Sequence, residues 1–174
     1  GEGRYEIGQE VLPVDALKFK DSRKYPERLK EAMDNTGETD ALVVMGGAVH
    51  SIELVEIIAD NLKYYTGPIV FDPVMISTSG HQLIKDETID ACKTHLFPLA
   101  TLVTPNLDEV SVLVNQKIST VEQMEEAGKQ ILAMGTQAVL VKGGHLQQEE
   151  LVSFLVQNNQ PTEQFKSQRI ASNN

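Results

Sequence analysis

The sequence has little of what builds a disulfide, a zinc site or an aromatic binding surface. Of 174 residues, one is cysteine, none is tryptophan and 5% are aromatic. The single cysteine, Cys92, cannot form an intrachain disulfide, and the four histidines lack the short spacings of zinc ligands. Few aromatic residues also disfavour grooves that stack carbohydrate or single-stranded nucleic acid. These classes of site are therefore disfavoured.

Positive charge is also scarce. The chain has 15 Lys and Arg against 25 Asp and Glu, a net charge of −10. An acidic surface repels nucleic acid and anionic membranes, so neither is an expected partner. A phosphorylated ligand would need a local nest of N–H groups or a positioned cation. No apolar run reaches membrane-spanning length and the N-terminus shows no signal-peptide pattern, so we expect a soluble cytoplasmic protein.

From residue 25 onward, helical patterns alternate with short apolar segments. Strands are predicted over residues 41–45, 69–71, 101–104 and 138–141, and helices over 26–35, 52–62, 87–97, 107–114 and 119–134. Ser51 is placed to cap the second helix, and Ser119 with Glu122 has the spacing of a capping box. Residues 151–156 and 164–170 predict a C-terminal β-hairpin, whereas residues 1–24 fit no clear pattern. The whole predicts one α/β domain with a parallel sheet covered by helices on both faces.

Ligand-type residues follow each of the four predicted parallel strands. These are Gly46–Gly47, Asp72–Pro73, Thr104 to Asn106, and Lys142 to Gly144. In a parallel sheet these strand ends share one edge, where ligands of such folds bind. The sequence therefore predicts one crevice that contains acidic and amide groups, a lysine and two glycine pairs.

This set suits phosphoryl transfer, which depends mainly on positioning and charge neutralisation. Asp72 and Glu109 could hold Mg²⁺, which takes few carboxylates and keeps several waters. Asn106 opens a helix whose free N–H groups would face an anion, and Lys142 offers a cation for phosphates. Gly143 and Gly144 would let the backbone approach a nucleotide.

Each feature also has a structural interpretation. Asp–Pro commonly begins a turn, Asn106 is equally suited to capping its helix, and a single lysine is usually solvated. Gly–Gly is often only a turn. Met75 and Cys92 are expected to be buried core residues. The convergence of four clusters on one edge nevertheless favours a functional site over these separate readings.

Three ordered segments resemble a known family. Residues 70–80 (VFDPVMISTSG), 102–109 (LVTPNLDE) and 138–145 (AVLVKGGH) are similar to motifs of the hydroxymethylpyrimidine and phosphomethylpyrimidine kinases. The resemblance runs from about residue 40 to residue 174. It implies a ribokinase-like fold, a three-layer α/β/α arrangement around a parallel sheet. It further implies ATP-dependent phosphorylation of hydroxymethylpyrimidine and of its monophosphate in thiamine biosynthesis, with Mg²⁺, a small pyrimidine substrate and a homodimer.

The resemblance also implies roles for individual residues. Metal binding would fall to Asp72 and Glu109. Nucleotide binding would fall to Thr104, Asn106, Lys142, Gly143 and Gly144, and pyrimidine binding to Gly47, Ala48 and Val74.

The sequence departs from the family in three places. Residues 1–40 do not match the family's opening segment, and Ala48 stands where a methionine usually contacts the pyrimidine. The family's Thr-His-Gly-Thr-Gly-Cys anion hole would follow Asn174, so no catalytic residue is identified. We therefore expect residues 1–174 to form a single, partial kinase domain that is weakly active or inactive by itself. The alternatives are a pyridoxal kinase, which shares the fold, and a non-catalytic relative that binds a nucleotide or another ligand.

Overall fold

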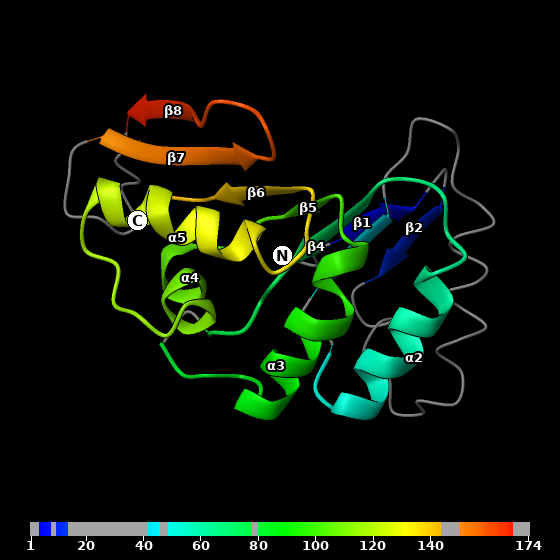
Figure 1. The fold of residues 1–174 in the computed structure, drawn as a ribbon. Coiled ribbons are helices and arrows are strands. Elements are labelled where there is room, and N and C mark those ends of the chain that lie inside the picture. Colours follow the sequence, from blue (N-terminus) through cyan, green and yellow to red (C-terminus); the bar gives the residue numbers. More distant parts are fainter. Residues whose placement is uncertain are drawn as a thin grey trace.

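The computed structural model describes residues 4–7, 10–13, 42–45, 49–77, 80–143 and 150–168 (Figure 1). The strands are β1 Arg4–Ile7, β2 Glu10–Pro13, β3 Leu42–Met45, β4 Ile69–Asp72, β5 Leu102–Val103, β6 Ala138–Val141, β7 Glu150–Gln157 and β8 Glu163–Gln168. The helices are α2 Ile52–Leu62, α3 Asp86–His95, the short 3₁₀ helix η4 Phe97–Leu99, α4 Leu107–Leu113 and α5 Val121–Leu132.

A six-stranded sheet in the order β3-β4-β5-β6-β7-β8 forms the centre of the molecule. Its first four strands are parallel, and β7 and β8 add an antiparallel hairpin. The predicted α/β class, the parallel strands and the C-terminal hairpin are thus confirmed. A separate antiparallel pair, β1 with β2, lies in the region where the sequence showed no clear pattern. The predicted helix over residues 26–35 lies outside the described residues.

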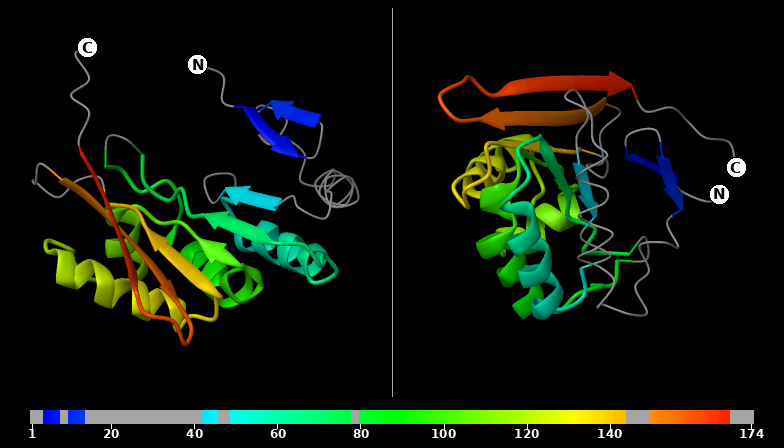
Figure 2. Two further views of the ribbon diagram at one scale, coloured as in Figure 1. Left: turned by 90° about the horizontal axis from the view of Figure 1, so that it is seen from above. Right: turned by 90° about the vertical axis from the view of Figure 1, so that its right-hand side faces the viewer.

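The four α-helices of the described residues lie on one face of the sheet (Figure 2). Side chains alternate along a strand, and on β4, β6 and β7 every second residue is buried against these helices. Phe71 and Phe97 meet in this core with ring centroids 5.5 Å apart. Met75 and Cys92 are also fully buried, as predicted. Burial raises the pKa of the Cys92 thiol to about 12, so the thiol stays protonated.

Side-chain caps fix where the helices begin. Ser51 accepts a hydrogen bond from the Leu54 N–H at 3.3 Å, which confirms the predicted cap of α2. The predicted capping box of α5 is wrong by one residue, because Thr120 and Gln123 form it. Both the Ser119 and the Thr120 N–H groups donate to the Gln123 side chain, so the glutamine secures the later register. No helix of the described residues is long and apolar enough to cross a membrane.

Candidate active site at the ends of the parallel strands

The ends of β4, β5 and β6 bring three of the predicted site residues into direct contact. Thr104 Oγ1 donates to Asp72 Oδ1 at 3.0 Å, and Lys142 Nζ lies 3.0 Å from the same oxygen. These residues are up to 70 positions apart in the sequence. The prediction that the strand ends converge on one edge is therefore confirmed for these three side chains.

The strand register places this cluster on the face of the sheet away from the four helices. Val70 pairs with Leu102, and Val103 pairs with Val139. Because side chains alternate, Asp72 shares a face with Val70, as Thr104 does with Leu102. The helix-facing positions between them are buried, whereas those on the Asp72 face are half-buried. The Asp72 carboxylate thus stays open to a ligand, with 27% of its side chain exposed.

Asn106 and Glu109 form a capping box at the start of α4. The Asn106 side chain accepts from the Glu109 N–H at 3.0 Å, and the Glu109 carboxylate accepts from the Asn106 N–H at 2.8 Å. We expected free N–H groups at the start of α4 to face an anion. Two of them are instead hydrogen-bonded within the helix. The capping interpretation of Asn106 is confirmed, and any role with a nucleotide would come in addition to it.

Glu109 is a buried carboxyl group beside the cluster, with 2% of its surface exposed. Burial raises its pKa, and the negative charge of Asp72 acts in the same direction. The N–H groups of Asn106 and Met75 and the charge of Lys142 lower the pKa, but burial outweighs them. The backbone of Met75 is a contact that the sequence did not reveal, because a methionine in an apolar run indicates only core packing.

The raised pKa of Glu109 predicts how stability depends on pH. The folded state holds this proton more tightly than the unfolded state, where the pKa is near 4.5. The stabilising contribution is therefore complete below that value and is lost as pH rises through the folded pKa. We expect the free energy of unfolding of the wild type, relative to Glu109→Gln, to fall as the pH rises above 4.5. Urea unfolding over that range measures it.

Glu122→Gln is the matched control for this prediction, because it removes an exposed carboxyl group from the first turn of α5. The control should keep the pH dependence of the wild type. If Glu109→Gln also keeps it, then Glu109 does not titrate differently in the folded protein.

Gly143 follows Lys142 and lies against β7. Its N–H donates to Ser153 Oγ at 3.2 Å, a contact that the sequence did not reveal. A Cβ at this position would overlap the carbonyl oxygen of Val152. Packing of β6 on β7 therefore requires a glycine here, whether or not a nucleotide approaches.

Of the remaining predicted site residues, the structure describes Val74 alone. Val74 is half-buried, and its N–H donates to the Asp72 carbonyl at 2.9 Å, which makes a tight turn after β4. Gly47, Ala48 and Gly144 lie outside the described residues.

The donor set around Asp72 fits Mg²⁺ better than Zn²⁺ or Cu²⁺, because it offers carboxylate oxygen rather than histidine or cysteine ligands. The described residues contain no group of three histidine, cysteine or acidic side chains that could hold a metal ion by themselves. Mg²⁺ does not need such a cage, because it binds through one or two carboxylates together with waters and phosphates. Asp72 offers a partly exposed carboxylate for this purpose, whereas the Glu109 carboxylate is already engaged by backbone N–H groups.

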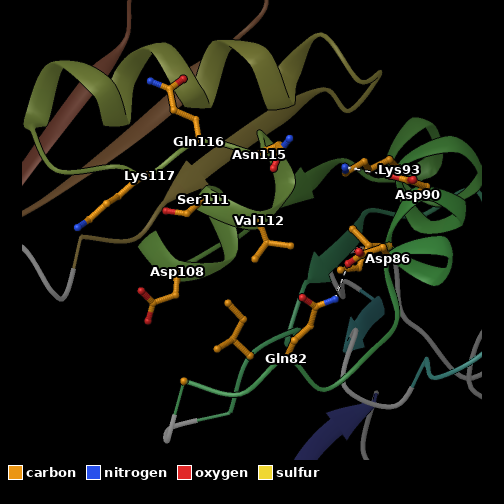
Figure 3. Close-up of a pocket in the computed structure, with 13 residues that line it drawn as sticks. Gln82, Asp86, Asp90, Lys93, Asp108, Ser111, Val112, Asn115, Gln116 and Lys117 are labelled. Atoms are coloured by element: carbon orange, nitrogen blue, oxygen red, sulfur yellow. Dashed lines mark hydrogen bonds and ion pairs between the residues drawn. The ribbon is translucent and has the colours of Figure 1, made fainter.

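A separate groove of about 860 Å³ lies between α3 and α4 (Figure 3). Asp86, Asp90 and Lys93 line one side, and Asp108 and Lys117 line the other. Lys93 pairs with Asp90 at 3.2 Å. None of the predicted site residues lines this groove, so it is distinct from the strand-end cluster.

Comparison with known proteins agrees with these features. The family described as phosphomethylpyrimidine kinase matches residues 26–174. A hydroxymethylpyrimidine/phosphomethylpyrimidine kinase of Mycobacterium tuberculosis is 42% identical over 103 residues, which are 59% of this chain and 38% of that protein. The chain thus spans well under half the length of this relative.

Two solved structures resemble the fold. A phosphomethylpyrimidine kinase from Clostridium difficile has a TM-score of 0.71 and 34% identity, covering 84% of this chain and 62% of that one. A pyridoxal kinase from Bacillus subtilis, solved as an ADP complex, has a TM-score of 0.76 and 30% identity, covering 94% of this chain and 59% of that one.

Proposed function

This chain belongs to the phosphomethylpyrimidine kinase family, and we propose that it supports ATP-dependent phosphorylation of hydroxymethylpyrimidine and its monophosphate for thiamine biosynthesis. One observation carries the proposal. Asp72, Thr104 and Lys142 come from three different strand ends and meet at one carboxylate oxygen. A scaffold protein has no need for a carboxylate and an ammonium group placed together at the ligand-binding edge of the sheet.

Each residue of the site has a separate role in this proposal. Asp72 would hold Mg²⁺, with Glu109 acting through a water molecule or by fixing the start of α4. When bound, Mg²⁺ would neutralise the charge of the phosphates. Lys142 would contact the nucleotide phosphates, and Thr104 would keep Asp72 in place. The nucleotide would lie along Asn106 and the Gly143–Gly144 turn, and Val74 with Gly47–Ala48 would border the pyrimidine.

Use of ATP rests on the kinase family and on the ADP that accompanies the Bacillus subtilis pyridoxal kinase structure. Phosphoryl transfer depends on the placement of charges more than on covalent chemistry by the protein. A partly exposed carboxylate and a partly exposed ammonium group 3.0 Å apart meet that requirement.

Substrate comparison tests the proposal. We expect slow ADP release with ATP, Mg²⁺ and hydroxymethylpyrimidine, and a kcat/KM at least about tenfold lower with pyridoxal, because a site that pairs the polar groups of one ring leaves some of its own groups unpaired with the other. Binding of ATP should be measured beside turnover, since the chain spans 38% of the Mycobacterium relative. Nucleotide binding without transfer to either substrate would favour the non-catalytic alternative.

Pyridoxal phosphorylation is the second candidate, favoured by one observation. The pyridoxal kinase of Bacillus subtilis has the higher TM-score of the two structures, 0.76, and covers 94% of this chain. The same assay separates the candidates, because a higher kcat/KM with pyridoxal than with hydroxymethylpyrimidine would reverse the assignment.

A further inference from the structure

Two residues with different proposed ligands are bound to each other. Asp72 is proposed to hold a metal ion and Lys142 to contact phosphates, yet Lys142 Nζ lies 3.0 Å from Asp72 Oδ1. The Thr104 hydroxyl donates to the same oxygen. Asp72 therefore already has one cation and one hydrogen-bond donor on a single oxygen atom.

A divalent ion and the Lys142 ammonium group do not fit well on this carboxylate together. Mg²⁺ binds carboxylate oxygens at about 2.1 Å, well inside the distance of an ammonium contact. Two cations that share one carboxylate lie within a few ångströms of each other, and their repulsion grows as water is excluded. A metal ion on Asp72 would thus weaken the contact of Lys142, and the reverse also holds.

Lys142 has the freedom to leave while its backbone stays fixed. Its N–H donates to the Pro105 carbonyl at 2.8 Å, and its backbone bridges to Asn106. The side chain, by contrast, is 42% exposed and ends in a flexible four-carbon stem. Only the side chain must move to release Asp72, whereas the Thr104 hydroxyl can remain and keep the carboxylate oriented.

We propose that Lys142 is a tethered cation that competes with a divalent metal ion for Asp72 and moves to the nucleotide phosphates when the metal ion binds. The second half of this inference rests on the proposed function. This movement makes binding of the metal ion and binding of the nucleotide cooperative, because each ligand helps Lys142 to leave Asp72. Thr104 acts as a positioning residue that holds Asp72 in both arrangements.

The competition is measured by titrating the chain with Mn²⁺, followed by electron paramagnetic resonance, with Mg²⁺ as competitor. Lys142→Met should bind Mn²⁺ about threefold to fivefold more tightly than the wild type without nucleotide, the upper part of the range expected from loss of a partly exposed ion pair. The same variant should bind ATP more weakly. Its Mn²⁺ affinity should rise less than that of the wild type when ATP is added, because only the direct contact between metal ion and phosphates remains.

Two further variants separate the inference from general effects. Lys129→Met removes the same charge from a surface pair with Glu125 on α5 and should leave Mn²⁺ affinity within about twofold of the wild type. Thr104→Val keeps the shape but removes the hydroxyl, and should weaken Mn²⁺ binding because Asp72 loses its orienting donor. Lys142→Met and Thr104→Val thus shift the affinity in opposite directions. Thermal unfolding verifies that each variant is folded.

An unchanged or weaker Mn²⁺ affinity in Lys142→Met would overturn the inference, and so would the absence of Mn²⁺ binding in that variant. The proposed function can fail independently. If no pyrimidine or pyridoxal is phosphorylated but Lys142→Met binds Mn²⁺ more tightly, the competition stands and the kinase assignment falls. If the pyrimidine is phosphorylated but Lys142→Met leaves the Mn²⁺ affinity unchanged, the kinase assignment stands and the competition falls.

Discussion

Replacing Asp72 with asparagine is expected to lower the rate of ATP-dependent phosphorylation by at least about a hundredfold, the usual cost of losing one electrostatic group that stabilises a transition state. Asparagine keeps the size of the side chain, and its amide oxygen can still accept the Thr104 hydrogen bond. It removes the negative charge that would hold the metal ion beside the phosphates. The loss should therefore fall on the transfer step, measured as ADP release at saturating substrate.

Asp108→Asn is the matched control, because it makes the same chemical change at an exposed position one residue before Glu109. It should keep activity within about twofold of the wild type, as surface substitutions usually do. If Asp72→Asn is folded and retains most of the wild-type activity, then Asp72 does not hold the metal ion. The metal site must then be assigned to other residues.

The second large effect concerns stability. Gly143→Ala is expected to lower the free energy of unfolding by about 3 kcal/mol, at the upper end of the cost of overpacking. The added Cβ would overlap the backbone carbonyl of Val152, and it would lie 3.1 Å from the Met124 side chain. A strand backbone cannot rotate away as a side chain can, so β6 and β7 would have to separate. Urea unfolding measures the change.

Gly128→Ala provides the comparison, because it adds the same methyl group on α5. That Cβ would meet side-chain atoms of Val156 and Val141 rather than backbone. Alanine also favours the helix by about 1 kcal/mol, which offsets part of the crowding. The loss should therefore be clearly smaller than at Gly143. Equal losses would show that β7 can shift to accept a Cβ at Gly143.

The glycine pair after Lys142 does not by itself identify a nucleotide contact. The glycine pair after Lys142 predicted a backbone that a nucleotide can approach, and the structure gives Gly143 a separate packing reason. Reduced activity in Gly143→Ala would therefore not demonstrate a nucleotide contact. The sequence could not reveal this, because the contact depends on how β7 returns beside β6.

The sequence predicted the fold well where the evidence was local. Hydrophobic periodicity located β3 to β6 and the four helices, and the parallel order then brought Asp72, Thr104 and Lys142 to one edge. Local evidence was ambiguous at α5, where Ser119 and Thr120 both precede a polar residue three positions later. The choice between them depended on which register the Gln123 side chain could satisfy.

The detailed contacts of the site were harder to predict, because they join distant parts of the chain. Periodicity placed Asp72 and Lys142 near each other but did not show that they pair, or that Thr104 shares the same oxygen. For Asn106, the sequence left capping and ligand binding open, and the structure shows the cap. Burial of Glu109 could not be predicted from a charged residue in a helical first turn.

The separation of these residues along the chain has a consequence for folding. The Asp72–Lys142 pair closes a loop of 70 residues, and the bond from Thr104 to Asp72 closes one of 32. Contacts over such distances form late, because loop closure costs entropy before the contact can repay it. The cluster therefore assembles only after β4, β5 and β6 are aligned. If Asp72 holds a metal ion, the metal affinity during refolding would report that β4 and β5 are aligned, because the Thr104 contact orients the carboxylate.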